Sequence, residues 1–399
     1  MKVVKGIAAF LFLVGLGLVL VQPVLDADGG REDVEGKTPV GSRRIEDPDD
    51  QQHPSVTLSR PLPGECFEIE ERSGLSLVAA QNGKRVRVGL PTAGPTVTVR
   101  GTAPIRWSPS GLFFGDGKGR LYDLDANREE RLFSGRRSWD WSPAGDCAIA
   151  ATEAGLEYGV VATGERGRLW DVPAKQLAFS PNGRRLAVSL LRALQGGLWM
   201  ANLETGETAP VVEEPVWMLG WFSNRSVLYS KTVQSGKLRY ATGTGGTGIV
   251  RGITDVYEVH RCGSRVLVTA SPADGPRGLY EIVSSAGALR SSPLAAPRSG
   301  EGYLGISCSP DETAIVASEL TGPEDAGPLV LLSGDGTFLG ELDPGATAHP
   351  LWGPPGEGIL YLKRGRSGTW RVWQYAENGV PRPTGFESQP EYYDWSLHR

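Results

Sequence analysis

The sequence predicts an all-β fold, a β-propeller built from four-stranded blades, and three observations indicate it. Of the 399 residues, 54 are glycine and 29 are proline, both above the usual ~7% and ~5%, and helix interiors disfavour both residue types. Apolar residues make up 40% of the chain, with 11 Trp, 11 Tyr and 10 Phe, so most of it can form a packed core. One sequence unit also recurs about every 41 residues, the period of a propeller blade.

The N-terminus carries an apolar segment that is long enough to cross a membrane. Met1 is followed by Lys2 and Lys5, and residues 6–25 contain no charged side chain. Twenty helical residues span roughly 30 Å, the thickness of the hydrocarbon layer. Basic residues before such a segment favour a cytoplasmic N-terminus, with the remainder of the chain outside the cytoplasm. We therefore predict a single-pass signal anchor in the cell membrane over residues 1–25.

A cleaved signal peptide is the alternative for the same segment. The apolar regions of signal peptides usually run ~7–15 residues, which is shorter than this segment. No Ala-x-Ala cleavage site follows, since Leu25-Asp26-Ala27 is a poor match. Cleavage would leave a secreted or periplasmic protein, so both alternatives place the rest of the chain outside the cytoplasm.

Residues 26–62 are predicted to form a linker. Residues 26–52 hold nine acidic and four basic residues, four Gly and two Pro, and no aromatic residue. Such a composition buries too little apolar surface to offset the entropy of ordering the chain. We expect this segment to act as a tether that packs on nothing, and the propeller domain to cover residues 63–399.

An aromatic residue followed by Ser-Pro-x-Gly marks the repeats of this domain. Proline presets φ for the first corner of the turn, and glycine tolerates its left-handed exit. The clearest copies begin at Trp107, Trp141 and Phe179, and weaker copies begin at Phe222, Arg261, Cys308 and Trp352. We call the turn that begins at this serine the anchor turn. The position equivalent to the serine, whatever residue fills it, falls at 108, 142, 180, 223, 262, 309 and 353.

Each anchor turn precedes an apolar strand, a glycine-containing hairpin and a strand that alternates apolar and polar residues. The apolar strands are predicted at 112–114, 186–188, 227–229, 266–268, 315–316 and 359–361, and the alternating strands at 119–124, 198–203, 279–283 and 370–375. A single unit of this size cannot bury its apolar faces, whereas units stacked around a ring bury them against one another.

The two ends of the domain set the number of blades. Residues 71–75 align with the anchor turn at Ser108, and strands are expected at 75–80, 85–90 and 96–100. Residues 393–396 repeat the sequence that opens the blade at Trp141. The last residues are therefore predicted to form the innermost strand of the sheet that contains residues 66–100. This clasp would close a ring of eight blades; seven is the alternative if the first unit is irregular.

The anchor turns and the Leu-Tyr-x-Leu-like strand at Leu121–Leu124 resemble the repeats of TolB-type propellers. The Gly-His and Trp-Asp dipeptides of WD-repeat propellers are missing as a periodic feature. The resemblance covers about residues 66–397, and it implies a propeller fold. Propellers of this kind occur as periplasmic interaction proteins and as the substrate-gating halves of some serine peptidases.

No residue is predicted to be catalytic, cofactor-binding or metal-ligating. The nearest match to a nucleophile elbow, Gly305–Ser309, lacks the second glycine and lies at an anchor turn. The four histidines are scattered at 53, 260, 349 and 398. The four cysteines at 66, 147, 262 and 308 contain no Cys-x-x-Cys pair, and an extracytoplasmic location permits three disulfide connectivities. Pairing of Cys262 with Cys308 is not expected, because equivalent strands of neighbouring blades appear too far apart for a Cα separation of ~6 Å.

Three further features have structural explanations that compete with functional ones. Trp107, Trp141 and Trp352 lie at anchor turns, so packing between blades explains them before a carbohydrate surface does. Asn224-Arg225-Ser226 fits a glycosylation sequon but also replaces an anchor turn. The basic run 363–366 is expected to be a solvated hairpin tip, with contact to an anionic surface as the alternative.

The sequence favours a binding protein over an enzyme. The net charge of −5 gives no basic surface for nucleic acid, and no cofactor is expected. We expect a membrane-tethered, extracytoplasmic propeller that binds a protein or peptide partner in the cell envelope. The alternative is a hydrolase or lyase whose site is assembled in the central channel from single residues of several blades. A closed pocket with three or more convergent carboxylates or histidines would favour the enzyme, and a broad, shallow face would favour binding.

Overall fold

The computed structural model describes residues 57–68, 77–82, 85–90, 96–101, 105–123, 128–133, 136–161, 163–191, 197–231, 236–272, 277–285, 287–299, 301–321, 326–376, 379–388 and 393–395. The chain divides into residues 1–55 and residues 56–399. The first unit, which includes the predicted anchor, lies outside the described ranges. Within those ranges no helix has the length and apolar character needed to cross a membrane.

The described residues of the second unit form antiparallel sheets and one short 3-10 helix, η1 (Gly64–Phe67). Six sheets have four strands. In order from the centre of the ring outward they are β31 (Tyr393–Trp395), β1 (Val78–Asn82), β2 (Arg85–Gly89) and β3 (Thr96–Arg100); β4 (Arg106–Trp107), β5 (Phe113–Gly115), β6 (Arg120–Asp123) and β7 (Arg128–Arg131); β8 (Arg136–Trp141), β9 (Cys147–Thr152), β10 (Leu156–Val160) and β11 (Arg166–Trp170); β12 (Ala174–Phe179), β13 (Arg185–Leu190), β14 (Leu198–Asn202) and β15 (Thr208–Val212); β16 (Trp217–Ser223), β17 (Ser226–Ser230), β18 (Arg239–Thr242) and β19 (Thr247–Ile249); and β20 (Asp255–Cys262), β21 (Arg265–Ser271), β22 (Gly278–Ser285) and β23 (Ala288–Ala295).

The remaining sheet has seven strands because one long strand serves two units. Its strands are β24 (Tyr303–Cys308), β25 (Ala314–Glu319), β26 (Gly327–Ser333), β27 (Phe338–Trp352), β28 (Ile359–Arg364), β29 (Trp370–Tyr375) and β30 (Pro381–Glu387). The first part of β27 pairs with β26 and its last part pairs with β28. With β27 counted twice, the sheets are consistent with eight four-stranded blades, which we number as units 1 to 8 from β31–β3 onward.

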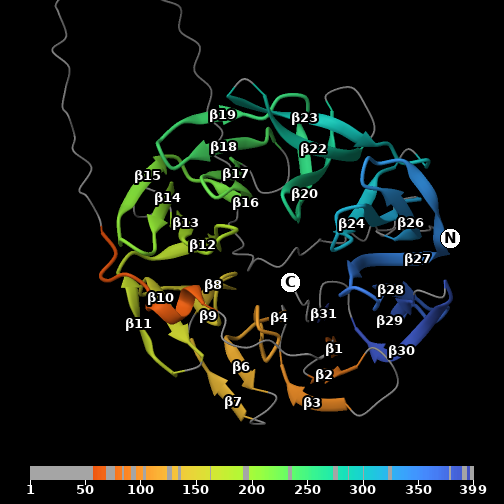
Figure 1. Ribbon diagram of the computed structural model, residues 1–399, viewed down its shortest axis with the longest axis horizontal. Coiled ribbons are helices and arrows are strands. Elements are labelled where there is room, and N and C mark those ends of the chain that lie inside the picture. The colour runs from red at the N-terminus through yellow and green to blue at the C-terminus, as the bar shows by residue number, and fades with distance from the viewer. Residues whose placement is uncertain are drawn as a thin grey trace, which may run out of the picture. The chain divides into compact units, whose positions relative to one another are not determined.

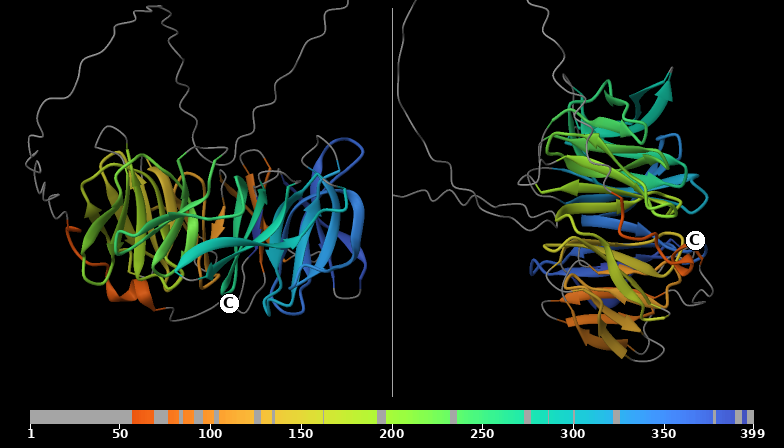
Figure 2. Two further views of the ribbon diagram at one scale, coloured as in Figure 1. Left: turned by 90° about the horizontal axis from the view of Figure 1, so that it is seen from above. Right: turned by 90° about the vertical axis from the view of Figure 1, so that its left-hand side faces the viewer.

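The sheets stand side by side around a common centre (Figure 1). Figure 2 shows them edge-on, with strands that run between two faces of the ring and with η1 at one of those faces. This face carries the anchor turns, which join the first and second strands of units 2 to 8, and the turns between third and fourth strands. We call it the anchor face.

The ends of the ring are joined as the repeat predicts. Strand β31 pairs antiparallel with β1, with Val78 opposite Trp395, Ala79 opposite Asp394 and Ala80 opposite Tyr393. Val78 and Ala79 are fully buried. The C-terminal strand therefore completes the sheet that the N-terminal strands begin, and no edge of β1 is left unpaired.

The anchor turns have two lengths. In the regular form the serine N–H donates to the carbonyl five residues later, as in Ser142 to Cys147 at 2.7 Å and Ser180 to Arg185 at 2.8 Å. The same bond occurs in units 2, 7 and 8. In unit 5, Ser223 instead lies directly opposite Ser226, and in unit 6 Cys262 lies opposite Arg265. These two turns are thus two residues shorter than the regular ones.

The end of the predicted linker packs on the ring, which corrects its predicted boundary. Leu58 and Leu62 are each 6% exposed and belong to the apolar core of units 3 and 4. The Leu58 N–H donates to the carbonyl of Gly206 at 2.8 Å, and the Leu62 N–H donates to that of Leu203 at 3.0 Å. Residues 26–52 contain no leucine and no aromatic residue, whereas these two leucines are buried in the core, so residues 58–62 belong to the propeller.

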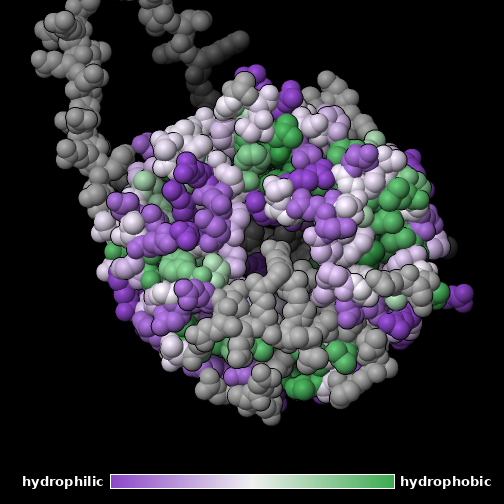
Figure 3. Space-filling view, in the orientation of Figure 1, coloured by the Kyte–Doolittle hydropathy of each residue, from purple (hydrophilic) through white to green (hydrophobic). Residues whose placement is uncertain are grey.

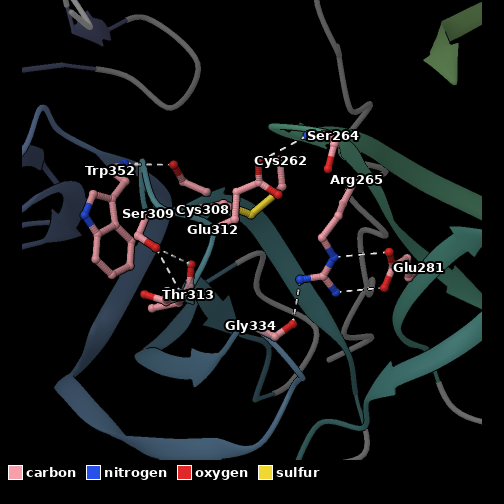
Figure 4. Close-up of a disulfide and its surroundings, with 12 residues drawn as sticks. Cys262, Ser264, Arg265, Glu281, Cys308, Ser309, Glu312, Thr313, Gly334 and Trp352 are labelled. Atoms are coloured by element: carbon pink, nitrogen blue, oxygen red, sulfur yellow. Dashed lines mark hydrogen bonds and ion pairs between the residues drawn. A yellow bond between two sulfur atoms is a disulfide. The ribbon is translucent and has the colours of Figure 1, made fainter. Parts of the chain in front are cut away.

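Two disulfides are present, and one of them was not expected from the sequence. Cys66 in η1 bonds to Cys147 in unit 3, with a Cα separation of 5.1 Å. Cys262 bonds to Cys308 across units 6 and 7, with a Cα separation of 5.5 Å (Figure 4). The expectation that this second pair is too far apart was wrong, because both residues lie at the ends of innermost strands, where neighbouring units are closest.

Candidate functional site

The anchor-turn tryptophans join neighbouring units, as packing between blades predicts. The indole Nε1 of Trp141 donates to the carbonyl of Arg106 in the preceding unit at 3.1 Å. Trp221 makes the same contact to the carbonyl of Ala178 at 3.1 Å. The side chain of Trp107 is 8% exposed. These three rings are buried in the core, so they are not exposed as a surface for carbohydrate.

Polar side chains on the innermost strands also connect one unit to the next. Asp140 accepts a hydrogen bond from Arg106 in unit 2 at 2.7 Å. Burial raises the pKa of Asp140, while the cation of Arg106 opposes that rise. Gln176 bonds to both the N–H and the carbonyl of Met218 in unit 5. A polar residue facing the centre of the ring is therefore often structural.

Glu258 and two histidines form a polar cluster on the innermost strands of units 6 to 8. Glu258 and His260 lie on β20, and their Oε2 and Nε2 atoms are 3.2 Å apart. The Gly305 N–H on β24 donates to the same Oε2 at 3.0 Å. His349, on β27, has a φ of 48°. A Cβ built on Gly305 would lie 2.9 Å from the His349 Cα, so glycine permits the close approach of these strands.

The cluster keeps its carboxylate charged and one imidazole neutral. The pKa of Glu258 is lowered: burial alone would raise it, but the hydrogen bond and charge of His260, the charge of His349 and the Gly305 N–H outweigh burial. The pKa of His349 is lowered chiefly by burial, against the attraction of Glu258. The side chains of Glu258 and His260 remain 22% and 27% exposed. An oriented, partly exposed Glu–His pair can exchange a proton with a bound molecule.

The cluster does not have the arrangement of a metal centre. Within the described ranges, no group of three or more His, Cys, Asp or Glu side chains is placed to hold a metal ion. His53 and His398 lie outside those ranges. Sequence spacing missed the approach of His260 to His349 because the two residues come from different units and are 89 positions apart in the chain (349 − 260).

A groove of about 790 Å³ opens across units 4, 5 and 6. Its lining includes the short anchor turn of unit 5 and the turns between third and fourth strands of all three units, so it lies on the anchor face. Figure 3 shows hydrophilic side chains gathered at the upper left of this face, where Figure 1 places β14, β15 and β18. Phe222, Tyr240 and Leu289 add apolar surface to the lining.

Two arginines line this groove without an ionic partner. Arg185 begins β13, and Arg225 lies in the short anchor turn of unit 5. No ion pair or hydrogen bond of either guanidinium is found within the described part of the chain. The neighbouring Arg184, by contrast, pairs with Glu204 at 3.4 Å. Arg225 belongs to the sequon-like segment, whose Asn224 Oδ1 accepts a hydrogen bond from the Asn182 N–H at 3.0 Å.

Other residues considered from the sequence are structural. Ser307 accepts a hydrogen bond from the Trp352 N–H at 2.8 Å, which joins units 7 and 8. The basic run is only in part a hairpin tip. Lys363 lies on β28, where its Nζ contacts both carboxylate oxygens of buried Asp343 at 2.7 and 2.8 Å. The turn itself covers residues 365–369.

Comparison with known proteins shows the fold and no family. No protein-family model matches the sequence, and no curated protein matches it. Among solved structures, the dihydro-heme d1 dehydrogenase NirN in complex with DHE is 14% identical, with a TM-score of 0.56 over 84% of this chain and 79% of that one. A eukaryotic initiation factor is 10% identical, with a TM-score of 0.52 over 82% of this chain and 99% of that one.

No family model identifies the TolB-type resemblance, which stays a prediction at the level of family. TolB from Acinetobacter baumannii is 13% identical over 81% of this chain and 83% of its own, with a TM-score of 0.38. The structural matches have unrelated roles and low identity, so they carry the fold alone. The chain is an all-β protein with the β-propeller fold.

Proposed function

We propose that the protein is a membrane-tethered, extracytoplasmic propeller that binds a protein or peptide partner. The observation that carries the proposal is the groove across units 4 to 6. Its lining comes from three units and combines apolar side chains with two cations that have no ionic partner among the described residues. Such a surface suits an extended polypeptide, whereas an enzyme site is usually a closed pocket with convergent polar groups.

The proposed location rests on the disulfides and on the N-terminal segment. Two structural disulfides are favoured in an oxidising compartment and are rare in the cytoplasm. Together with Lys2, Lys5 and the apolar residues 6–25, they support export of the propeller, whether the segment is retained or cleaved. A periplasm-active reporter fused after residue 399 should be active, and a cytoplasm-only reporter at the same position should be silent. The reverse pattern would overturn the proposed orientation.

Peptide selection tests the binding proposal directly. The full-length protein, immobilised in detergent, would be screened against a random peptide library displayed on phage. We expect selected peptides to share a sequence pattern and to bind in solution with micromolar affinity. A library that gives no enriched peptide over repeated rounds would count against a peptide-binding role.

The Glu258 cluster favours a second candidate, an enzyme with its site at the centre of the ring. In this proposal His260 transfers a proton and Glu258 orients its imidazole. Turnover of chromogenic esters, glycosides or polyuronides that disappears in His260→Gln and persists in His53→Gln would support it. Absence of turnover with all three substrate classes would leave Glu258 as a structural link between units 6 and 7.

A further inference from the structure

We propose that the groove across units 4 to 6 binds an acidic, extended segment of a partner protein, and that Arg185 and Arg225 recognise its carboxylates. The inference rests on the proposed function, because it names the class of partner for the same groove. It is carried by the placement of the two arginines, by the lack of a counterion and by the shape of the groove.

The two arginines come from neighbouring units, and both line the same groove. A Cβ built on Gly243 would lie only 2.8 Å from Nη1 of Arg185. The Gly243 N–H in turn donates to the carbonyl of Arg225 at 3.0 Å. The Arg185 guanidinium therefore crosses the boundary between units 4 and 5 and reaches the turn between β18 and β19, which is hydrogen-bonded to the backbone of Arg225. Glycine at position 243 makes this approach possible, since a side chain there would displace the guanidinium.

The two arginines bring positive charge to the groove without a counterion among the described residues. Among the lining residues are two arginines and one carboxylate, Glu207, whose Oε2 accepts a hydrogen bond from the Thr205 hydroxyl at 3.2 Å. Neither guanidinium has an ion pair or hydrogen bond within the ranges that the structure describes. The whole chain carries a net charge of −5, so this local excess of cations is a specific feature of the groove. Planar guanidinium groups in a concave surface are well suited to carboxylates.

The other lining residues favour a peptide over a small anion or a lipid headgroup. Phe222 and Tyr240 are partly exposed and contribute apolar surface beside the cations. A free anion would leave this surface unused, and a flat bilayer cannot enter a groove between three units. The hydroxyls of Thr242 and Thr244 lie 3.1 Å apart, and the Thr242 hydroxyl also accepts a hydrogen bond from the Gly246 N–H, so both are held within their own turn. An extended chain that alternates acidic and apolar residues matches both the cations and the apolar side chains of the lining.

Fluorescence polarisation with a defined probe tests the inference. The probe is a fluorescein-labelled nonapeptide in which Glu-Leu-Ser is repeated three times, titrated with the full-length protein in detergent. We expect saturable binding that weakens with added salt, and no binding of the peptide with Lys in place of Glu. Arg185→Gln and Arg225→Gln should each weaken binding by about fivefold, the value of one exposed ion pair.

Arg184→Gln is the matched control. This arginine is adjacent to Arg185 in the chain but pairs with Glu204 instead of lining the groove. We expect Arg184→Gln to bind the acidic probe as the wild type does, and all three variants to keep the wild-type thermal midpoint. Equal losses in Arg184→Gln and Arg185→Gln would overturn the inference, because they would indicate a general effect of net charge.

The inference and the proposed function can fail separately. If library-selected peptides bind but are unaffected by Arg185→Gln and Arg225→Gln, the binding role stands and the acidic-partner inference is wrong. If neither the selected peptides nor the acidic probe bind, the proposed function fails as well. Binding to vesicles that contain phosphatidylserine, lost in the two arginine variants without binding of the peptide, would identify a lipid surface and overturn the peptide assignment.

Discussion

The regular anchor turns of units 2, 3, 4, 7 and 8 and the short anchor turns of units 5 and 6 divide the propeller into two kinds of blade. In unit 4, Pro-Asn-Gly-Arg separates Ser180 from Arg185 at the start of the next strand, whereas in unit 5 only Asn224 and Arg225 separate Ser223 from Ser226. The short turn of unit 5 lines the groove, and the short turn of unit 6 contains a disulfide cysteine. In these two units a departure from the repeat coincides with the lining of a groove and with one end of a disulfide.

The largest effect is expected at the seam between the chain ends, which neither kind of anchor turn stabilises. Truncation before Glu391 removes β31 and exposes the edge of β1, where Val78 and Ala79 are fully buried. We expect a loss of ~5 kcal/mol in the free energy of unfolding, from lost backbone hydrogen bonds and lost burial, seen as a fall in the thermal midpoint. Deletion of residues 28–52 is the control and should leave the midpoint unchanged. A truncated chain that melts like the full-length protein would show that the ring does not depend on this pairing.

The disulfide of the short turn in unit 6 should have the next largest effect. Cys262 and Cys308 are 46 residues apart, and loop closure of this length corresponds to about 4 kcal/mol of stabilisation. In the double variant Cys262→Ser/Cys308→Ser we expect faster amide hydrogen exchange in β20 and β24. The matched variant Cys66→Ser/Cys147→Ser opens a longer loop of 81 residues and should cost about as much stability, but its faster exchange should appear in η1 and β9 and leave β20 and β24 protected. Unchanged exchange in β20 would mean that the short turn needs no covalent link.

Much of this architecture was predictable from local sequence. Short segments predict the Ser-Pro-x-Gly turns, the apolar strands and the closing strand. This works because turn conformation and the alternation of apolar and polar residues are both set within a few neighbouring residues. The structure confirms the predicted strand at 370–375 as β29 and the pairing of β31 with β1. Contacts between units could not be predicted from the sequence. Three features depend on where neighbouring sheets meet. They are the Cys262–Cys308 bond, the approach of His349 to Glu258, and the placement of Arg185 and Arg225 in one groove.

The histidine cluster gives a smaller, pH-dependent effect. The folded pKa of His349 lies below its ordinary value of 6.5, so protonation favours the unfolded chain and stability falls as the pH drops below that value. The lowered pKa of Glu258 adds a loss at more acidic pH, below its ordinary value of 4.5. We expect His349→Asn, chosen because asparagine tolerates a positive φ, to reduce the loss between pH 7.5 and 5.5 by roughly 1 kcal/mol.

Thermal midpoints of the wild type, His349→Asn and His53→Gln, measured across this pH range, check the assignment. His53 lies in the predicted linker, so its replacement should preserve the wild-type pH dependence. If the loss on acidification is the same in all three proteins, His349 is not the group responsible.

The smallest effect compares the serines of the two kinds of anchor turn. The Ser180 hydroxyl accepts a hydrogen bond from the Arg185 N–H at 2.9 Å and donates to the Asn182 Oδ1 at 2.9 Å. The Ser223 hydroxyl accepts one bond of 3.2 Å from the Arg225 N–H. Ser180→Ala should therefore destabilise the protein by ~1 kcal/mol and Ser223→Ala by about half as much, measured by chemical denaturation. Equal losses of unfolding free energy in the two variants would indicate that turn length does not change how much the serine stabilises the turn.

The central claim is that the short anchor turn of unit 5 creates a binding groove, and a turn exchange tests it most directly. Asn224-Arg225 would be replaced by Pro-Asn-Gly-Arg, the segment that occupies residues 181–184 in unit 4. This restores the regular turn length and keeps an arginine in the turn. We predict that the exchanged protein folds with at least the wild-type thermal midpoint and loses affinity for the acidic nonapeptide by tenfold or more. A correctly folded exchange variant that binds this peptide with wild-type affinity would contradict the claim.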